Sequence, residues 1–194
     1  MNSIKYTELL GDNVKPLLKF CGENVKLYSF CKINNPQCAE LDDNSEILDF
    51  AFIDAKESFK LGKYSLITWH CVVEGNAHVT IGDRCFLGPG TKVLGSTYEF
   101  NGYYTCEHLP EGTHATKYGD ITICDDAYIG ANSVIMPGVT IGEGALVGAN
   151  SLITHDLEPW CIYFGSPAKK LVKRQKPTDE RKAIIDAMNW KKNF

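Results

Sequence analysis

Aliphatic residues recur at every sixth position through most of this chain. In residues 123–158, ICDDAYIGANSVIMPGVTIGEGALVGANSLITHDLE, each block of six begins with isoleucine or valine, called here the lead residue, and the fourth residue after it is usually small. A helix repeats every 3.6 residues and a strand every two, so neither element alone produces a period of six. The period is met if each block is one short strand plus a turn, three blocks make a triangular coil, and the coils stack.

The same pattern begins further upstream with a longer step between coils. Lead residues lie six apart within a coil and eight apart between coils, so an early coil holds 20 residues and a late coil 18. The predicted core therefore consists of Leu27, Ile33, Leu41, Ile47, Ile53, Leu61, Ile67, Val73, Ile81, Leu87, Val93, Ile123, Ile129, Ile135, Ile141, Val147 and Ile153. Small residues are predicted to fit the corners, and glycines that follow a lead residue, such as Gly130 and Gly148, to turn the chain.

A loop insertion interrupts the repeat at residues 95–120. It carries four tyrosines, two histidines and several glutamates within STYEFNGYYTCEHLPEGTHATKY. Long loops inside a regular scaffold are usually functional or disordered, and the aromatic content argues against disorder. The alternative is a loop that only packs on a neighbouring subunit.

The two ends of the chain break the pattern. Residues 1–22 are predicted to cap the open end of the repeat region 23–158, because a solenoid needs its end covered. Residues 159–194 form a C-terminal segment in which Thr178 is predicted to cap a helix that runs to about Trp190. The apolar stripe of that helix is predicted to pack on the side of the solenoid.

Composition narrows the possible functions. The formal net charge of -4 gives no reason to expect nucleic acid or an anionic membrane as partner. No segment has transmembrane length and no signal peptide is recognisable, so a cytoplasmic protein without membrane insertion is expected. The eight cysteines show no CxxC spacing, and Cys31, Cys71 and Cys85 fall in the small inward position, so reduced packing cysteines are expected and no metal site is assigned.

The late repeats and the segment after them resemble a known family. The stretch GVTIGEGALVGANSLITHDLEPWCIYFGSPAKKLVKR is similar to the hexapeptide-repeat acyltransferases, which include galactoside, maltose and xenobiotic acetyltransferases and the sugar acetyltransferases of surface-polysaccharide pathways. The resemblance covers about residues 25–175, and its LEPWCIYFGSPAKKL ending looks most like the polysaccharide enzymes. It implies an all-β solenoid that is a left-handed parallel β-helix, a homotrimer with active sites between subunits, and acetyl-CoA as co-substrate.

The resemblance also implies where CoA binds. Carried over by position, the pantetheine contacts are Ala131 and Ala149, the residues near its far end are Thr154 and His155, and the residues toward the phosphates are Lys169, Lys173 and Arg174. CoA is polyanionic and this is the most basic stretch of an acidic chain, so the charges agree in sign. Lysine is common in the family where His155 stands, and the alternative interpretation of the basic run is a solvated surface.

The catalytic base does not follow from the resemblance. Members that acetylate hydroxyl groups commonly place a histidine soon after the block before the loop, where this chain reads TKVLGSTYEF without histidine. The candidates are His108 first, then His114 and Glu99, all in the loop. Amines are better nucleophiles than hydroxyls once deprotonated, so the missing histidine favours an amino group as acceptor.

Three functions remain open on the sequence. The first is an acetyl-CoA-dependent acetyltransferase acting on the amino group of a nucleotide-linked amino sugar, in cell-surface, O-antigen-like polysaccharide biosynthesis. The second is an O-acetyltransferase of a glycan, galactoside or antibiotic hydroxyl. The third is a non-catalytic or metal-binding trimeric β-helix protein, whose zinc would need converging histidines from coil positions.

Overall fold

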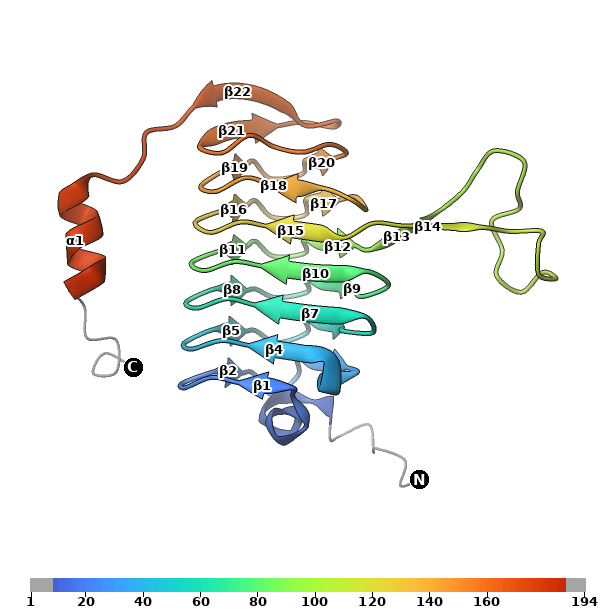
Figure 1. The fold of residues 1–194 in the computed structure, drawn as a ribbon, viewed down its shortest axis with the longest axis horizontal. Coiled ribbons are helices and arrows are strands. Elements are labelled where there is room, and N and C mark those ends of the chain that lie inside the picture. Colours follow the sequence, from blue (N-terminus) through green and yellow to red (C-terminus); the bar gives the residue numbers. More distant parts are fainter. Residues whose placement is uncertain (1–8, 188–194) are drawn as a thin grey trace.

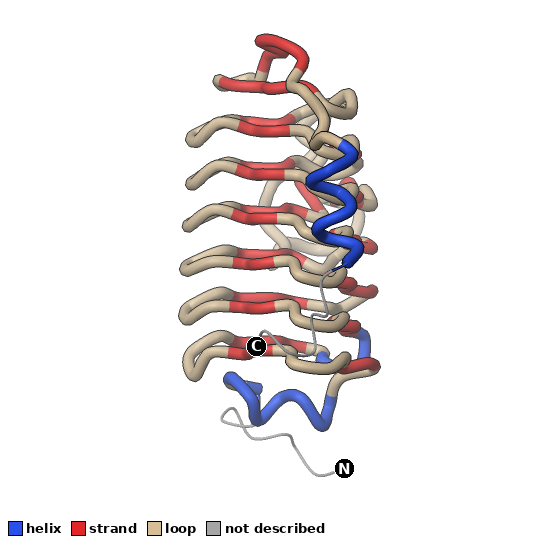
Figure 2. Tube along the Cα trace, turned by 90° about the vertical axis from the view of Figure 1, so that its left-hand side faces the viewer, coloured by secondary structure: helices blue, strands red, loops and turns tan. Residues whose placement is uncertain are grey.

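Each block of six folds as one short strand and a corner, and three blocks close one coil of a left-handed parallel β-helix (Figure 1). The structure is a computed structural model and describes residues 9–187. Successive coils stack along one axis, as the view along a second direction also shows (Figure 2). The predicted fold class is therefore confirmed.

The coils build three parallel sheets within the described residues. The first sheet contains β1 (Phe20–Cys21), β4 (Ala39–Leu41), β7 (Ser58–Leu61), β10 (His78–Ile81), β15 (Ile121–Ile123) and β18 (Thr140–Ile141). The second contains β2 (Lys26–Leu27), β5 (Glu46–Ile47), β8 (Leu66–Ile67), β11 (Phe86–Leu87), β16 (Tyr128–Ile129), β19 (Leu146–Val147), β21 (Cys161–Phe164) and the antiparallel β22 (Lys169–Lys173). The third contains β3 (Lys32–Asn34), β6 (Phe52–Asp54), β9 (Val72–Glu74), β12 (Lys92–Leu94), β17 (Val134–Ile135) and β20 (Leu152–Ile153). We call the corner between the first and second sheets the first corner, that between the second and third the second corner, and that between the third and first the third corner.

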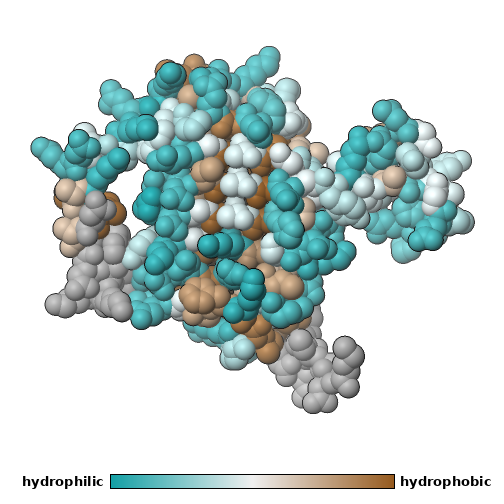
Figure 3. All heavy atoms as spheres, viewed as in Figure 1, coloured by the Kyte–Doolittle hydropathy of each residue, from teal (hydrophilic) through white to brown (hydrophobic). Residues whose placement is uncertain are grey.

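The strand register follows the coil length read from the sequence. In the early coils Val79 pairs with Phe59, twenty residues away, and in the late coils Tyr128 pairs with Leu146, eighteen residues away. All the predicted lead residues are buried, most of them completely, and form one continuous core. On the first sheet the outward position is the exposed Phe20 on β1 and is polar on the later strands. Thr80 and Thr122 stand in register there, and Figure 3 shows a pale column with hydrophobic residues beside it and hydrophilic residues further out.

The glycines after the lead residues have a different role from the one predicted. A Cβ on Gly130 would lie 2.4 Å from the backbone nitrogen of Ala149 in the next coil, so these glycines permit close stacking of the corners. The left-handed residue comes two positions later, for example at Asn132 with φ 57° and Asn150 with φ 57°. Asparagine tolerates this conformation better than most residues. The prediction that these glycines turn the chain was wrong for that reason.

The ends of the solenoid are closed in different ways. At the N-terminal end, the short helix η2 (Gly11–Leu17) lies under the first coil and inserts Val14 into the core; a second short helix, η3 (Pro36–Cys38), follows β3. At the other end, β22 folds back over β21. Within the described part of the chain, no helix is long and apolar enough to cross a membrane.

The C-terminal helix α1 (Asp179–Ala187) begins where the sequence predicts, since the Arg181 amide donates to the Thr178 hydroxyl at 3.4 Å. Its predicted end at Trp190 lies outside the described residues. The helix runs beside the first corner (Figures 1 and 2), yet Ile184 remains 62% exposed and Ile185 40% exposed. The prediction that this stripe is packed against the solenoid was wrong, because a groove separates them.

The inward cysteines are free and buried, as expected. Burial raises the pKa of Cys31 to about 11 and that of Cys85 to about 12, from the ordinary value of 9.0. Above pH 9 the unfolded chain releases these protons while the folded protein retains them, so stability should fall as pH rises. We expect the urea midpoint to drop less between pH 8 and pH 10.5, roughly the interval over which unfolded thiols ionise, in a Cys85→Ala variant than in the wild type.

The exposed Cys106 supplies the control for this experiment. A Cys106→Ala variant should show the same alkaline drop as the wild type. An equal drop in the Cys85→Ala variant would show that the buried thiol does not contribute to the pH dependence.

Candidate functional site

The second corner of the late coils carries two of the predicted CoA contacts. Ala131 and Ala149 occupy equivalent positions in consecutive coils, and the Asn150 amide donates to the Ala131 carbonyl at 2.8 Å. Ala149 is exposed and Ala131 is half-buried. Phe164 covers Gly148 from the layer above. These small side chains leave the backbone of the corner accessible to an extended ligand.

Thr154 and His155 lie across the third sheet from that corner. Both directly follow β20 and are exposed, and the Thr154 hydroxyl lies 3.3 Å from Nδ1 of His155. The third sheet therefore separates the two pairs of predicted contacts, with Ala131 and Ala149 before its strands and Thr154 and His155 after them. The four residues border one face of the β-helix.

The three predicted phosphate contacts do not lie together, because β22 runs from the second corner to the first. Lys169 pairs with Phe164 at the second corner, whereas Lys173 pairs with Cys161 at the other end of the strand. Arg174 continues to the first corner, where its Nη1 donates to the Gly144 carbonyl at 3.1 Å and its guanidinium lies 5.4 Å from the Trp160 ring. Of the three basic residues, only Lys169 is brought to the corner of Ala149.

The loop insertion forms an arm that extends away from the coils (Figure 1). Its base is a hairpin of β13 (Ser96–Tyr98) and β14 (Thr116–Tyr118), and every residue from 100 to 112 is exposed. His108 belongs to this exposed stretch. His114 lies nearer the hairpin, and its Nδ1 is buried without a hydrogen-bond partner in the described structure. An unpaired buried nitrogen is costly, so it marks a place where a further polar group would be stabilising.

Glu99 is engaged in an ion pair at the hairpin. Its Oε2 lies 2.5 Å from Nζ of Lys117, and its Oε1 accepts the Asn101 amide at 3.1 Å. The hydrogen bond from Lys117, followed by that from the Asn101 amide, holds the pKa of Glu99 below its usual value. A carboxylate with a lowered pKa is a weaker proton acceptor, so this geometry weakens Glu99 as a candidate base.

The structure adds a polar cluster at the root of the arm that was missed in the sequence. Glu74 ends β9, and its Oε1 accepts hydrogen bonds from Ser96 Oγ at 2.5 Å and Asn76 Nδ2 at 2.7 Å. Asn76 and Ser96 are twenty residues apart, which is one early coil. The coil length therefore contained the signal that these two side chains are neighbours.

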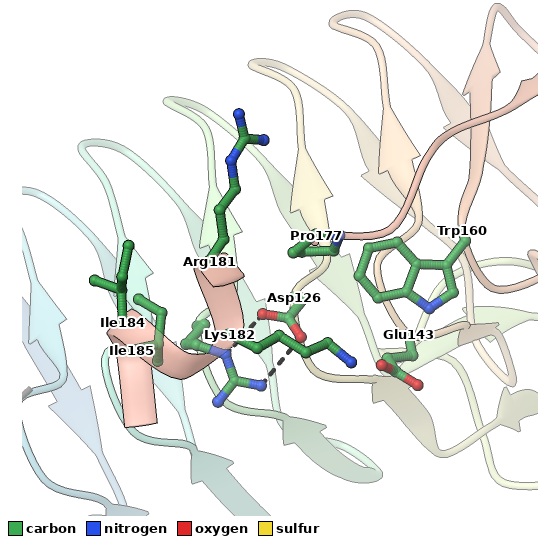
Figure 4. Close-up of a pocket in the computed structure, with 9 residues that line it drawn as sticks. Asp126, Glu143, Trp160, Pro177, Arg181, Lys182, Ile184 and Ile185 are labelled. Carbon is green, nitrogen blue, oxygen red and sulfur yellow. Dashed lines mark hydrogen bonds and ion pairs between the residues drawn. The ribbon is translucent and has the colours of Figure 1, made fainter. Parts of the chain in front are cut away.

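A separate groove lies at the first corner, on the side of α1 (Figure 4). Its volume is about 610 Å³, with Ile184 and Ile185 on one side and Trp160 and Glu143 on the other. Arg84 pairs with Asp126 at its floor, at 2.7 Å and 3.0 Å, and this hydrogen bonding raises the pKa of the guanidinium. None of the predicted CoA or base residues lines this groove.

The two histidines of the regular coils lie at different corners. His70 is exposed at the second corner and stacks on Phe50, with ring centroids 5.2 Å apart. His78 begins β10 at the third corner, and its Nδ1 lies 2.8 Å from the Ser58 hydroxyl. Within one chain they do not converge on a common point.

Comparison with known proteins agrees with the repeat pattern. The family described as "Bacterial transferase hexapeptide (six repeats)" matches residues 120–155. The chain is 34% identical over 122 residues to a chloramphenicol acetyltransferase of Klebsiella aerogenes, a match that covers 57% of each chain. It is 35% identical over 128 residues to a probable macrolide acetyltransferase of Lysinibacillus sphaericus, covering 57% of this chain and 67% of the relative. The chain thus spans somewhat more than half the length of the chloramphenicol acetyltransferase.

Among solved structures, AntD matches the whole fold. AntD is an N-acyltransferase from Bacillus cereus whose crystal structure contains dTDP and 3-hydroxybutyryl-CoA. The superposition covers 97% of this chain and 100% of AntD, with 28% sequence identity and a TM-score of 0.81. The coils, the family match and the identity to the macrolide relative over two thirds of its length show that this chain belongs to the bacterial hexapeptide-repeat transferase family.

Proposed function

We propose that the protein transfers an acetyl group from acetyl-CoA to the amino group of a nucleotide-linked amino sugar. The observation that carries the proposal is the match to AntD over nearly the whole chain, since AntD is an N-acyltransferase solved with dTDP and an acyl-CoA. A variant of AntD was also solved with dTDP-4-amino-4,6-dideoxyglucose and coenzyme A. The product would serve cell-surface polysaccharide biosynthesis, in the cytoplasm.

Acetyl-CoA is proposed to lie along the third sheet. Its pantetheine would pass the second corner at Ala131 and Ala149 and reach toward Thr154 and His155. Lys169 is exposed at the adjoining end of β22 and supplies positive charge for a phosphate. Lys173 and Arg174 are assigned to the phosphates as well, and the position of Arg174 beside Trp160 makes it the weaker of the assignments.

The reaction requires attack of the acceptor on the thioester carbonyl carbon. The tetrahedral oxyanion that forms would be stabilised by a backbone N–H of a late coil, because fixed dipoles in a sheltered site stabilise such charge efficiently. An amine needs less help from a base than a hydroxyl does, once it has lost its extra proton. The absence of histidine in TKVLGSTYEF supports the amine for that reason.

A hydroxyl acceptor is the second candidate function. The chloramphenicol and macrolide acetyltransferases are the observation that favours it. It requires a strong base, and His108 or His114 would fill that role. The unpaired Nδ1 of His114 supports His114 over the exposed His108.

A homotrimer is proposed as the functional assembly, with each site completed by the arm of a neighbouring subunit. The extension of the arm away from its own coils supports this arrangement (Figure 1). Sedimentation equilibrium of the purified protein tests it, with a mass of three chains expected.

Mass spectrometry of complete reactions tests the activity. Purified protein is incubated with acetyl-CoA and matched nucleotide-linked sugars that carry either an amino group or a hydroxyl at the same carbon. We expect a gain of one acetyl group on the amino sugar only. Acetylation of the hydroxyl sugar would establish the second candidate, and absence of product on every acceptor would contradict both.

A further inference from the structure

Glu74 lies where the arm leaves the coils, and its carboxylate is held in one orientation. Oε1 accepts both Ser96 Oγ and Asn76 Nδ2, while Asn76 Nδ2 also lies 3.2 Å from Ser96 Oγ. Oε2 has no hydrogen-bond partner among residues 9–187, and the side chain is half-buried. One oxygen is thus fixed by the protein, and the other is available to a ligand.

The position of Glu74 relative to the proposed donor site follows from strand register. On the third sheet Glu74 of β9 pairs with Leu94 of β12. In the next two strand pairs, Val93 of β12 stands beside Ile135 of β17, and Ile135 stands beside Ile153 of β20. Thr154 therefore stands three coils above Glu74 at the same edge of the third sheet. Neighbouring strands are about 4.8 Å apart, so the separation along the stack is about 14 Å. For Glu74 to act on the acceptor, the thioester end of the pantetheine must lie on this edge between Thr154 and Glu74, so that the acceptor nitrogen can stand between the thioester carbon and Oε2.

The surroundings of Glu74 favour a cation. Tyr98 of β13 lies near enough to feel the charge of Glu74, since its pKa is raised first by burial, then by the negative charge of and hydrogen bond to Glu107, and to a smaller extent by Cys106 and Glu74. Asp54 lies on the coil below and accepts the Asn35 side-chain amide at 2.7 Å. Lys56 lies at the same corner, and its Nζ is 3.3 Å from Asn76 Oδ1 rather than on the carboxylate. Asp54 and Glu74 stand on neighbouring strands at this edge, and two adjacent carboxylates suit a substrate that arrives as an ammonium ion.

We propose that Glu74 is the catalytic base of the acetyl transfer, and this inference rests on the proposed function. Its Oε2 takes one proton from the acceptor ammonium and leaves a neutral amine. The nitrogen then forms a bond to the thioester carbonyl carbon, the carbon–sulfur bond breaks, and the second amine proton passes to the sulfur to give free CoA. Glu74 finally releases its proton to water, so charge and atoms balance. Asn76 and Ser96 are positioning residues in this scheme.

Two of the three candidates in the arm, Glu99 and His108, are less suited to this role in the single chain. Glu99 is paired with Lys117 and has a lowered pKa, and His108 lies in a stretch where every side chain is exposed. Glu74 combines two neutral donors on one oxygen with a second oxygen that has no hydrogen-bond partner among residues 9–187. It is also on a rigid coil rather than on the arm, which suits a reacting group.

The test compares Glu74→Gln with the wild type across the neutral pH range. The wild-type enzyme would use the Glu74 carboxylate and the ammonium form of the acceptor, so its kcat/KM should be nearly independent of pH in this range. The Glu74→Gln variant can use only the fraction of acceptor that is already a neutral amine. That fraction grows with pH, so the kcat/KM of the variant should rise about tenfold per pH unit. At neutral pH the loss should be about a hundredfold, and it should shrink as pH increases.

Further variants separate chemistry from structure. Glu74→Asp should recover part of the rate and the flat profile, and Ser96→Ala should lower kcat without changing the slope. Glu46→Gln is the matched control, because Glu46 faces outward on the second sheet and pairs with Lys26 at 2.9 Å. Its rate should equal that of the wild type. Calorimetric titration with acetyl-CoA should give the same affinity for all four variants.

Two outcomes distinguish this inference from the proposed function. If the wild type acetylates an amino sugar and Glu74→Gln keeps both its rate and its flat profile, Glu74 is not the base. If the wild type transfers acetyl to no acceptor although it binds acetyl-CoA, the proposed function fails, and the role of Glu74 fails with it. If Glu74→Gln keeps the flat dependence of kcat/KM on pH and His114→Ala loses it, His114 is the group that takes the proton from the acceptor.

Discussion

Replacing Ile81 by alanine should lower the free energy of unfolding by about 2–5 kcal/mol, the range for truncation of a fully buried aliphatic side chain. Ile81 is 0% exposed and lies in the middle of the stack, with Leu61 in register below it and Ile123 above. Each coil contacts only its neighbours, so a cavity at this layer weakens both interfaces at once. Urea denaturation followed by circular dichroism measures the change.

Thr80 provides the control, because it precedes Ile81 on the same strand and its side chain points outward. A Thr80→Ala variant should stay within about 0.5 kcal/mol of the wild type, as surface substitutions usually do. Equal losses in the two variants would show that the strand faces are assigned incorrectly. An unchanged midpoint for Ile81→Ala would show that this layer does not contribute to the cooperative core.

Replacing Gly75 by alanine should destabilise the protein by about 3 kcal/mol or more, beyond the usual range for an added methyl group. A Cβ at this position would lie 1.7 Å from the backbone carbonyl oxygen of Asp54 in the coil below. Because the clash is with backbone, no rotamer change can relieve it, and the two coils must separate locally. Thermal unfolding of the purified variant measures the loss.

Gly112 is the matched position for this comparison. It lies in the exposed arm with φ +84°, and nothing stands within 4 Å of an added Cβ. Since asparagine tolerates the left-handed conformation, Gly112→Asn should leave the melting temperature nearly unchanged. A Gly75→Ala protein that melts with the wild type would contradict the close approach of the third corners.

The coil register was predictable because it depends on a local repeat. A lead residue such as Ile129 is buried for the same reason as Val147 eighteen residues later. The six residues of each block are therefore enough to predict which side chain points inward and where the corner lies. The role of the glycines was not predictable in the same way. At Gly130 an added Cβ would lie 2.4 Å from the backbone nitrogen of Ala149 in the next coil. This close approach arises only when the coils stack, so the sequence of one block does not reveal it.

The candidate CoA contacts Ala131, Ala149, Thr154 and His155 stay a prediction from the family resemblance. The structure places these four residues at the two edges of one sheet, an arrangement that follows from the coil register and could be read from the sequence. The positions of the basic residues relative to one another could not be predicted, because β22 crosses the second sheet and separates Lys169 from Arg174. Sequence distance between these two is only five residues, so the separation depends on the direction of the strand.

The sequence by itself determined the solenoid, its three faces, the coil lengths and the position of the arm, since a six-residue period can bury its aliphatic positions in few other ways. Only the tertiary structure determined which polar side chains form hydrogen bonds with one another. Glu74 and Ser96 are 22 residues apart, and their hydrogen bond forms because one turn of the coil brings the root of the arm directly over β9. Hydrogen bonds between coils depend on stacking distance and side-chain direction, which the repeat pattern does not specify.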